Sequence, residues 1–552
     1  MNVATAAALA TNLGDLIAEI LAEAGVTAVY GVVSIHNMPI LDAIGRQGVI
    51  RLIASRGEAG AVNMADAHAR VSGTLGVAVT STGTAAGNAA GAMVEALTAG
   101  TPLLHLTGQI ETTHLDQHRG YIHEAPAQLQ MLEAVSKGAY RVRTLSEAAA
   151  VLTNAIAEAL TPPMGPVSVE IPIDLQAAEI ACRSRSSVPQ VELVQPQDSD
   201  VRDAATALRS CRRPMLLLGG GARAAASAAT RLADLGVGVV TSTNGRAIVP
   251  EDHPGSLGAF NLSTELQDLY RSCDCFFIVG TRLRSNETWT YKLALPERRF
   301  TVNCDARARD HVYATGRFIH ADSRLFLQAL ADRIGCELDL DPEFGSALAG
   351  VRAKSVRNLR DGLGVYAQLV DILQEEMPAD AVWVRDVTIS NSLWGNRLLR
   401  IAGPRNGVHA VGGGIGQGLP MAIGAAIAAG GRKVVALCGD GGFALNVGEL
   451  FTAAQENADV TLLLMNDRGY GVIKNIQDAS YDGRRHGAEI LTPDFSCISR
   501  SVGIPHFLVQ SMSSLRDGLR SAFAVQGPAV IELDMISLGP FRRAFAGPPV
   551  AN

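Results

Sequence analysis

The sequence predicts three α/β domains, each built on a doubly wound parallel sheet. The chain has 552 residues, which is too long for a single hydrophobic core. Hydrophobic residues make up 47% of it and charged residues 18%, the composition of an ordinary globular protein. Three stretches share one pattern, in which short Val, Ile and Leu runs are followed by glycine-rich turns and amphipathic segments. Buried parallel strands and their crossover helices have this pattern.

The apolar runs predict where the strands of each domain lie. In the first domain, residues 1–182, we expect strands at 28–33, 77–81, 102–107 and 167–171. In the second, residues 200–335, we expect them at 215–218, 237–241, 275–279 and 300–303. In the third, residues 361–552, we expect them at 381–385, 433–438, 460–465 and 529–533. The polar segment 183–200 contains two prolines and predicts a linker, and the less hydrophobic segment 336–360 predicts a connector.

Charge, cysteines and apolar segments argue against several classes of protein. A net charge of −7 and a pI near 6.0 provide no basic field for nucleic acid or for an anionic membrane. The eight cysteines form no CxxC pair, so we expect buried thiols rather than a zinc site or disulfides. The N-terminus has no cationic start and contains Asp15 and Glu19, unlike a signal peptide. The uncharged run 408–431 is rich in glycine and contains Pro420, which favours a loop and a buried helix over a membrane span. We expect a cytoplasmic protein.

Two loops of the third domain carry the strongest functional pattern. The apolar run 433–438 leads directly into Gly439-Asp440-Gly441-Gly442, and the run 460–465 leads into Asn466-Asp467-Arg468-Gly469-Tyr470-Gly471. Open α/β sheets bind ligands at the carboxyl ends of their strands. Glycines let backbone N–H groups approach phosphate oxygens, and carboxylates together with phosphates are the usual ligands of Mg²⁺. A single GDGG is often a tight turn, but two acidic loops 27 residues apart are far more specific.

This order of strands and loops resembles the thiamine-diphosphate motif of the acetolactate synthase, pyruvate decarboxylase and benzoylformate decarboxylase family. The resemblance covers nearly the whole chain and implies pyrimidine-binding, middle and diphosphate-binding domains, in that order. It implies that Asp440, Asp467 and the Gly469 carbonyl bind Mg²⁺. It also implies a set of cofactor-binding residues, namely Gly439, Gly441, Gly442, Gly469, Tyr470 and Gly471. Because the family often has Asn where this chain has Asp467, Asn466 remains an alternative ligand.

Further residues are similar to the family's cofactor contacts. The segment Ser-Arg-Gly-Glu-Ala-Gly-Ala at 55–61 resembles the glutamate segment, which implies that Glu58 hydrogen-bonds the aminopyrimidine ring and promotes loss of the thiazolium C2 proton. The glycine-rich run 412–420 resembles the loop beneath the cofactor. By that resemblance the Gly413 carbonyl accepts from the aminopyrimidine amine and Ile415 wedges the two rings. Thr388, after the strand 381–385, lines the cofactor pocket or belongs to a plain βα turn.

The substrate is less clearly indicated. His36 lies in the first βα loop, as in the benzaldehyde lyase branch, where a histidine can move protons near neutral pH; a lone histidine is more often structural. Gln109 and Gln128 match family active-site amides or their neighbours, whereas the nearby histidines could be solvated. The chain lacks the paired histidines of the pyruvate decarboxylase branch, and Ile473 and Lys474 stand near the position of that branch's glutamate. Simple conversion of pyruvate to acetaldehyde is therefore disfavoured.

The resemblance favours a decarboxylase of 2-oxo acids, a carboligase that joins the resulting carbanion to a second carbonyl, or both. A lyase acting on 2-hydroxy ketones is the alternative. An oxidoreductase that uses Gly-Gly-Gly-Ala-Arg at 219–223 is a distant one, because it leaves Glu58 and both acidic loops unexplained. Whether the middle domain binds FAD stays open. The substrate is expected to be a small 2-oxo acid or aldehyde. Because Glu58 and Asp440 lie in different domains, the family arrangement implies a homodimer or homotetramer with active sites shared between subunits.

Overall fold

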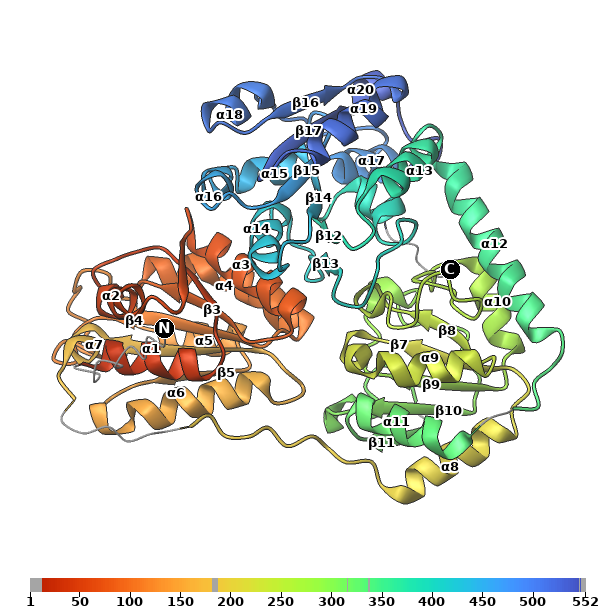
Figure 1. Ribbon diagram of the computed structural model, residues 1–552, viewed down its shortest axis with the longest axis horizontal. Helices are drawn as coiled ribbons and strands as arrows, with labels where there is room; N and C mark the ends of the chain where they lie inside the picture. Colours follow the sequence, from red (N-terminus) through yellow and green to blue (C-terminus); the bar gives the residue numbers. More distant parts are fainter. Residues whose placement is uncertain (1–11, 181–186, 315, 336–337, 546, 548–552) are drawn as a thin grey trace, which may run out of the picture. The chain divides into compact units, whose positions relative to one another are not determined.

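The computed structural model describes residues 12–180, 187–314, 316–335, 338–545 and 547. It contains three sheets in which every strand pair is parallel, which confirms the predicted fold class (Figure 1). By its contacts the chain divides into two compact units. The first unit comprises Met1–Glu192, Val411–Gly430 and Asn446–Ala458, and the second comprises the remainder. The first sheet belongs to the first unit, and the other two sheets belong to the second unit.

The first sheet has six strands in the order β2-β1-β3-β4-β6-β5. Their bounds are Arg51–Ala54 (β2), Ala28–Gly31 (β1), Gly76–Thr80 (β3), Leu103–Gln109 (β4), Pro166–Pro172 (β6) and Gly138–Arg141 (β5). Three helices share an apolar cluster with the central strands: α1 (Leu13–Glu23), α2 (Met38–Gln47) and α6 (Leu145–Leu160). The short helices α5 (Gln128–Val135) and α7 (Ile173–Ala177) follow β4 and β6. Burial of both faces explains why β1, β3, β4 and β6 have no polar alternation.

Helix α3 (Glu58–Ser72) is the most enclosed helix of the first unit. Residues 60–71 are all buried, because α3 packs against both α4 (Thr84–Ala99) and α14 (Gly418–Ala428). The approach of α14 is so close that a Cβ on Gly424 would lie 2.0 Å from the carbonyl oxygen of Met64. Helix α14 confirms the interpretation of the run 408–431 as a loop followed by a buried helix. Among the described helices, none is both long enough and apolar enough to cross a bilayer.

The second sheet has the order β11-β10-β9-β7-β8. Its strands are Arg317–His320 (β11), Arg299–Asn303 (β10), Cys275–Val279 (β9), Pro214–Leu218 (β7) and Gly238–Thr241 (β8). One face packs against α8 (Asp198–Arg209), α9 (Ala226–Asp234) and α11 (Ser323–Ile334). The other face packs against α10 (Thr264–Ser272) and α12 (Phe344–Leu363). The sheet is thus covered by helices on both sides.

The third sheet has the order β13-β12-β14-β15-β17-β16. Its strands are Gly407–His409 (β13), Val382–Arg385 (β12), Val434–Gly439 (β14), Val460–Asn466 (β15), Ala529–Asp534 (β17) and His506–Val509 (β16). Helices α13 (Tyr366–Glu376) and α19 (Met512–Phe523) pack on one face. The remaining helices are α15 (Asp440–Leu445), α16 (Glu449–Gln455), α17 (Gly471–Ser480), α18 (Phe495–Ser501) and α20 (Met535–Leu538).

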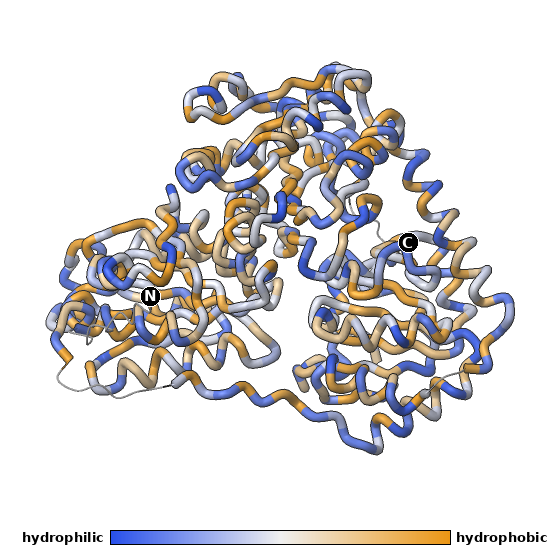
Figure 2. The backbone as a smooth tube through the Cα atoms, viewed as in Figure 1, coloured by the Kyte–Doolittle hydropathy of each residue, from blue (hydrophilic) through white to orange (hydrophobic). Residues whose placement is uncertain are grey.

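The structure confirms all twelve expected strands, and it corrects two other expectations. The segment 336–360 was expected to be a connector, but most of it belongs to the 20-residue helix α12, whose hydrophilic turns are visible in Figure 2. The expected linker 183–200 is irregular over its described residues 187–197, whereas 198–200 already belong to α8. The six described cysteines are free, and Cys182 and Cys336 lie outside the described residues. The exact domain boundaries stay predictions.

Candidate active site

The two acidic loops follow neighbouring strands of the third sheet. Strands β14 and β15 pair in parallel with Gly439 opposite Met465, so Asp440 and Asp467 both lie at the carboxyl edge of the sheet. Asp440 is 1% exposed, and one of its carboxylate oxygens accepts the Gly469 N–H at 2.9 Å. The other oxygen is buried without a hydrogen-bond partner among the described residues. An unsatisfied buried carboxylate oxygen is costly unless a cation or donor completes it.

The electrostatics of the pair fit a divalent cation. Burial, together with the neighbouring charge of Asp467, raises the pKa of Asp440 to about 7. Burial also raises the pKa of Asp467, against the attraction of Lys474, whose ammonium lies 3.5 Å from the Asp467 carboxylate. The described residues contain no cluster of three or more His, Cys, Asp or Glu side chains at metal-binding spacing. Two carboxylates and one carbonyl are instead an incomplete set of ligands, which suits a cation whose remaining ligands are phosphate and water oxygens.

The alternative ligand Asn466 is engaged elsewhere. Its amide nitrogen donates to Glu532 at 2.6 Å, and its oxygen accepts the Arg468 N–H at 3.2 Å. Glu532 also accepts from His506 at 2.9 Å. These contacts favour Asp467 over Asn466 as the second side-chain ligand of the cation.

Glycines allow the loops around this pair to pack closely. A Cβ on Gly441 would lie 2.7 Å from the Tyr470 ring, and one on Gly471 would lie 2.0 Å from the Asp467 carboxylate. Gly442 is buried within α15. Thr388 joins the same group, because its methyl carbon would lie 3.4 Å from a Cβ on Gly439. Larger residues at 441 or 471 would therefore displace Tyr470 or a metal-ligand candidate.

In the first unit, a buried carboxylate positions Glu58. Glu58 is the first residue of α3, is partly exposed, and accepts a hydrogen bond from the Asn88 amide at 3.1 Å. Just before it, the Arg56 and Gly57 N–H groups each donate to Glu449 at 3.1 Å. A Cβ on Gly60 would lie 2.1 Å from the same Glu449 oxygen, so only glycine fits there. Burial raises the pKa of Glu449, and a carboxylate at a helix N-terminus is stabilised by the helix dipole.

A second buried carboxylate holds the loop that contains Gly413 and Ile415. Glu95 accepts the Val411 N–H at 2.7 Å and the Gly412 N–H at 2.6 Å. The Arg70 guanidinium, which also pairs with Asp66, donates to Glu95 at 2.9 Å. At the other end of the loop, the Asn446 amide donates to the Gly416 carbonyl at 2.6 Å. Gly413 has a φ of +87°, and Ile415 is 39% exposed, so the tip of the loop is presented to a ligand while its ends are fixed.

His36 and its neighbours form a compact polar group in the first unit. His36 is 3% exposed, and its Nδ1 has no hydrogen-bond partner among the described residues. Its ring meets the His123 ring edge to face, with 5.1 Å between centroids. Burial lowers the pKa of His36, and His123 lowers it further, so we expect a neutral imidazole at pH 7. The loop after β4 therefore contributes one of its histidines to the surroundings of His36.

The two amides of this region brace the chain rather than face open space. The Gln109 side-chain oxygen accepts the Ile110 N–H at 2.8 Å and the Thr82 hydroxyl at 3.1 Å. The Gln128 oxygen accepts the Gly83 N–H at 2.6 Å and lies 3.0 Å from the same hydroxyl, whose single proton is shared between the two amide oxygens. The Gln128 oxygen is thus committed to the turn before α4, and the Gln109 oxygen to the backbone directly after β4. A catalytic role for Gln109 stays a prediction.

Packing accounts for the glycine-rich segment of the second sheet. The Gly221 N–H donates to the Gly280 carbonyl at 2.9 Å, and a Cβ on Gly219 would lie 2.2 Å from that carbonyl oxygen. The glycines at 219 and 221 therefore allow two loops to touch, and they need no dinucleotide to explain them.

Sequence patterns did not single out Glu95, Arg70 or Glu449 as functional. A polar or charged residue within an otherwise apolar helix was the available signal for Glu95 and Arg70, since buried charges are rare unless they are paired. For Glu449 the signal was weaker, because a single glutamate in the first turn of a short helix is common. Their roles depend on segments far away in the chain.

We expect the Glu95→Gln substitution to loosen the cofactor loop. Glutamine keeps one acceptor, but its NH₂ group must then face either a backbone N–H or Arg70, which leaves a buried donor or the guanidinium unsatisfied. Disruption of such a buried network costs about 3–5 kcal/mol. Thermal unfolding should therefore begin at a lower temperature, and thiamine diphosphate should bind more weakly in a calorimetric titration. The exposed Glu23→Gln variant is the control, and an unchanged Glu95→Gln protein would contradict this account.

Comparison with known proteins identifies the group to which the chain belongs. The N-terminal, central and C-terminal domain models of thiamine pyrophosphate enzymes match residues 11–131, 201–330 and 389–533. A Pseudomonas aeruginosa protein named probable 2-ketoarginine decarboxylase is 30% identical, over 94% of this chain and 93% of its own length. The acetolactate synthase isozyme 2 large subunit of Escherichia coli is 26% identical, over 93% and 94%. A probable acetolactate synthase large subunit of Methanocaldococcus jannaschii is 25% identical, over 94% and 91%.

These findings confirm the resemblance inferred from the two acidic loops and Glu58, and they lend no support to an oxidoreductase. Two of the three matched domain models describe thiamine pyrophosphate-binding domains, which supports thiamine diphosphate as the cofactor. The chain therefore belongs to the family of thiamine pyrophosphate enzymes.

Proposed function

We propose that the chain uses thiamine diphosphate and Mg²⁺ to decarboxylate a 2-oxo acid, to ligate the product carbanion to a second carbonyl, or both. The pair Asp440 and Asp467 carries this proposal, since a buried and a half-buried carboxylate at the carboxyl edge of a sheet, with one oxygen of Asp440 lacking a partner among the described residues, suit a cation bound to a diphosphate. The names of the relatives support the same chemistry. When bound, thiamine diphosphate supplies a nucleophilic carbon and an electron sink.

The residues of the chain divide the remaining work. Asp440, Asp467 and the Gly469 carbonyl would hold the cation, and the glycines at 439, 441, 442 and 471 would leave room for the diphosphate beside Tyr470. Thr388, which contacts Gly439, would line the same pocket. Glu58 would exchange a proton at the pyrimidine ring, held in place by the contacts of Glu449 with the start of α3.

A lyase that cleaves or forms 2-hydroxy ketones is the second candidate. The partnerless Nδ1 of His36 favours it, since a neutral imidazole can take up and return the proton of a hydroxyl group. Incubation with pyruvate, benzoylformate and benzaldehyde, followed by chromatography of the products, separates the candidates. Release of CO₂ indicates a decarboxylase, and coupling of two aldehydes without CO₂ indicates the lyase.

Dependence on the cofactor is the direct test of the proposed chemistry. Protein dialysed against a chelator should lose its activity towards 2-oxo acids. Activity should return only when thiamine diphosphate and a divalent cation are added together, because each provides part of the binding site of the other. Recovery with neither, after their removal has been verified by mass spectrometry and metal analysis, would rule out the assignment.

We further propose that the active protein is a homodimer or homotetramer with active sites shared between subunits. Glu58, Gly413 and Ile415 belong to the first compact unit, and Asp440 and Asp467 belong to the second. The first βα loop around His36 also exposes two large apolar side chains, Val33 and Ile35, which a subunit interface would cover.

Mixing two inactive variants tests the shared site. Under conditions that exchange subunits, Glu58→Gln mixed with Asp440→Ala should regain part of the activity, because one site of a heterodimer then carries neither substitution. Native mass spectrometry must show the mixed species. If mixed dimers form and no activity returns, the sites are not shared.

A further inference from the structure

The second compact unit contains a cavity of about 480 Å³ whose walls come from the second and third sheets and from the C-terminal segment. Thr241 and Thr243 line it at the end of β8, and Ser392, Leu393 and Arg397 line it after β12. Its volume lies within the range of sites for small molecules, about 300–1,000 Å³. None of the residues predicted from the sequence to contact cofactor or metal lines this cavity.

Two segments that line the cavity also contact the acidic loops or the helix that follows them. Thr388 would lie 3.4 Å from a Cβ on Gly439, and Ile389 would lie 3.3 Å from a Cβ on Gly471. Ser392 and Leu393 lie in the short π-helix Asn391–Gly395, which directly follows these contacts in the chain, and they reach the cavity wall. On another wall, the Phe545 N–H donates to the Asn475 side chain at 3.4 Å, and Asn475 belongs to α17, the helix that begins at Gly471. The same two segments thus serve the acidic loops and the cavity.

Arg397 lines this cavity and belongs to no ion pair among the described residues. Its guanidinium donates to the Ser392 carbonyl at 3.1 Å, and no carboxylate among the described residues forms an ion pair with it. Burial lowers the pKa of Arg397; Glu287 opposes this shift and Arg246 adds to it. A guanidinium has five N–H donors, and buried charges are normally paired. Most of the hydrogen-bonding capacity of Arg397 is therefore left for a ligand.

The acidic groups of the cavity are already engaged. Glu287 forms an ion pair with Arg284 at 3.3 Å and accepts the Thr243 N–H at 2.6 Å. Glu265 accepts from the Ser263 hydroxyl at 2.6 Å and from the Asn358 amide, and lies 3.9 Å from Lys354. The cavity therefore offers a guanidinium that belongs to no ion pair within the described part of the chain, whereas both of its carboxylates already have hydrogen-bond partners.

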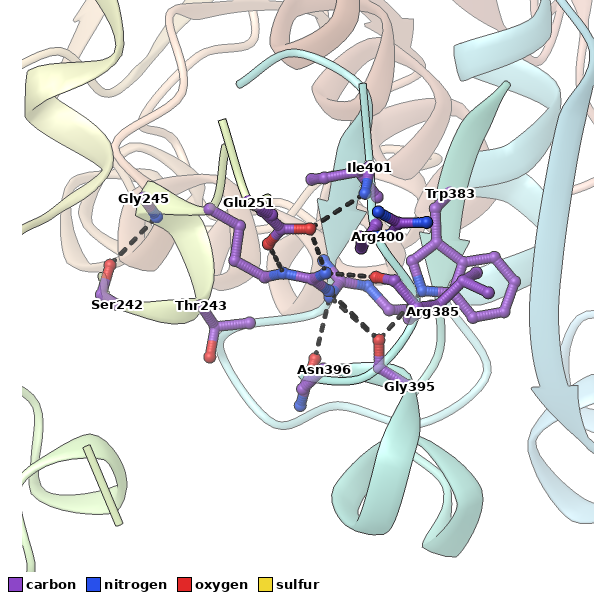
Figure 3. Close-up of polar contacts among 12 residues, drawn as sticks. Ser242, Thr243, Gly245, Glu251, Trp383, Arg385, Gly395, Asn396, Arg400 and Ile401 are labelled. Atoms are coloured by element: carbon purple, nitrogen blue, oxygen red, sulfur yellow. Dashed lines mark hydrogen bonds and ion pairs between the residues drawn. The ribbon is translucent and has the colours of Figure 1, made fainter. Parts of the chain in front are cut away.

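Neighbouring side chains fix the segment that carries Arg397 (Figure 3). The Arg246 guanidinium, paired with Glu251 at 2.7 Å, donates to the carbonyls of Gly395 and Leu399. The Arg385 guanidinium donates to the Asn396 side chain at 3.1 Å, and the Trp383 indole donates to the Gly395 carbonyl at 3.0 Å. Arg397 is thus held in place before a ligand arrives, which reduces the entropic cost of binding.

The remaining wall is apolar, with Phe260, Leu359, Leu393 and Phe545 among its residues. Resting on the function proposed above, we propose that this cavity receives the side chain of the 2-oxo acid, and that Arg397 selects substrates with a carboxylate at the far end. The methylene groups of such a substrate would lie along the apolar wall. A substrate with a cationic end would meet Arg397 with like charge.

Two substrates with the same carbon chain test the selection. The holoenzyme should decarboxylate 2-oxopentanedioate with a kcat/KM at least about 10-fold above that for 2-oxopentanoate, since a hydrogen-bonded charge contributes a factor of about 10–100. The cationic 5-guanidino-2-oxopentanoate should be the poorest of the three. R397Q should lower the ratio of the first two values by about 10- to 100-fold, and R397K should restore part of it. The exposed R400Q, three residues further along, is the matched control and should keep the wild-type ratio.

Two results would overturn the inference about Arg397: a wild-type preference for the neutral or the cationic substrate, or an unchanged ratio in R397Q. Either result would leave the proposed decarboxylation of 2-oxo acids intact. If the holoenzyme converts no 2-oxo acid, the proposed function is wrong. The inference about Arg397 is then tested by ligand binding alone. Calorimetric titration of the holoenzyme with glutarate should then show binding that weakens by about 10-fold or more in R397Q and not in R400Q. Absence of binding, or equal binding by both variants, would overturn it.

Discussion

Replacement of Glu58 by glutamine should lower kcat by about 10²- to 10⁴-fold, the usual contribution of a general acid or base. Glutamine keeps the shape of the side chain and can still accept from Asn88, but it cannot gain and lose a proton. Exchange of the C2 proton of bound thiamine diphosphate, followed by quenched NMR, should slow by a similar factor.

The fold should survive this change, because Glu58 is partly exposed and the start of α3 is held by Glu449 rather than by Glu58. Circular dichroism and the melting temperature should match those of the wild type. Glu133→Gln, an exposed glutamate on α5 in the same unit, controls for the loss of one negative charge. Proton exchange at the wild-type rate in Glu58→Gln would remove Glu58 from the mechanism.

Replacement of Asp440 by alanine should abolish binding of both metal and cofactor. Removal of a residue that merely supports a metal ligand typically costs about 10- to 100-fold in affinity, so the loss of a direct ligand should cost at least about 100-fold. Titration calorimetry with Mg²⁺ and thiamine diphosphate measures this loss. The melting temperature of the cofactor-free protein should not fall, because the substitution removes a buried carboxylate with a partnerless oxygen.

Related variants distinguish the individual ligands. Asp467→Asn should retain binding, since an amide oxygen can replace a carboxylate oxygen at Mg²⁺. Asn466→Ala should also retain it, because Asn466 is engaged with Glu532. Asp517→Asn on the surface of α19 is the control for charge. Loss of binding in Asn466→Ala with retention in Asp467→Ala would reverse the assignment of the second ligand.

The difference between predicted and observed strands has a physical origin. Central strands such as β9 and β14 are buried over nearly their whole length, so their sequences are continuous apolar runs. The five strands that were not predicted are β2, β5, β11, β13 and β16, and every one lies at the edge of a sheet. These five edge strands are short and partly exposed, as in β2, where only Ile53 is buried, whereas the edge strand β8 is fully buried and was predicted. Their sequences resemble loops because only part of each strand meets the core.

In the candidate site, too, the residues that could be predicted are those whose surroundings come from nearby sequence. Asp440, Asp467 and Glu58 could be predicted because each belongs to a short motif whose neighbours in sequence are also its neighbours in space. Glu95 could not, because its partners at Val411 and Gly412 lie more than three hundred residues further along the chain. The partner of a buried charge is set by tertiary packing, which no local pattern encodes.

The contact between Gly424 and Met64 bears on how this protein can evolve. A methyl group at position 424 would force apart two helices that support Glu58 and the loop tip at Ile415, although Gly424 takes part in no chemistry. Selection should therefore act on this position as strictly as on a catalytic carboxylate. In a survey of natural variants an invariant glycine at 424 would be mistaken for a catalytic feature, when it records only how closely two backbones must approach.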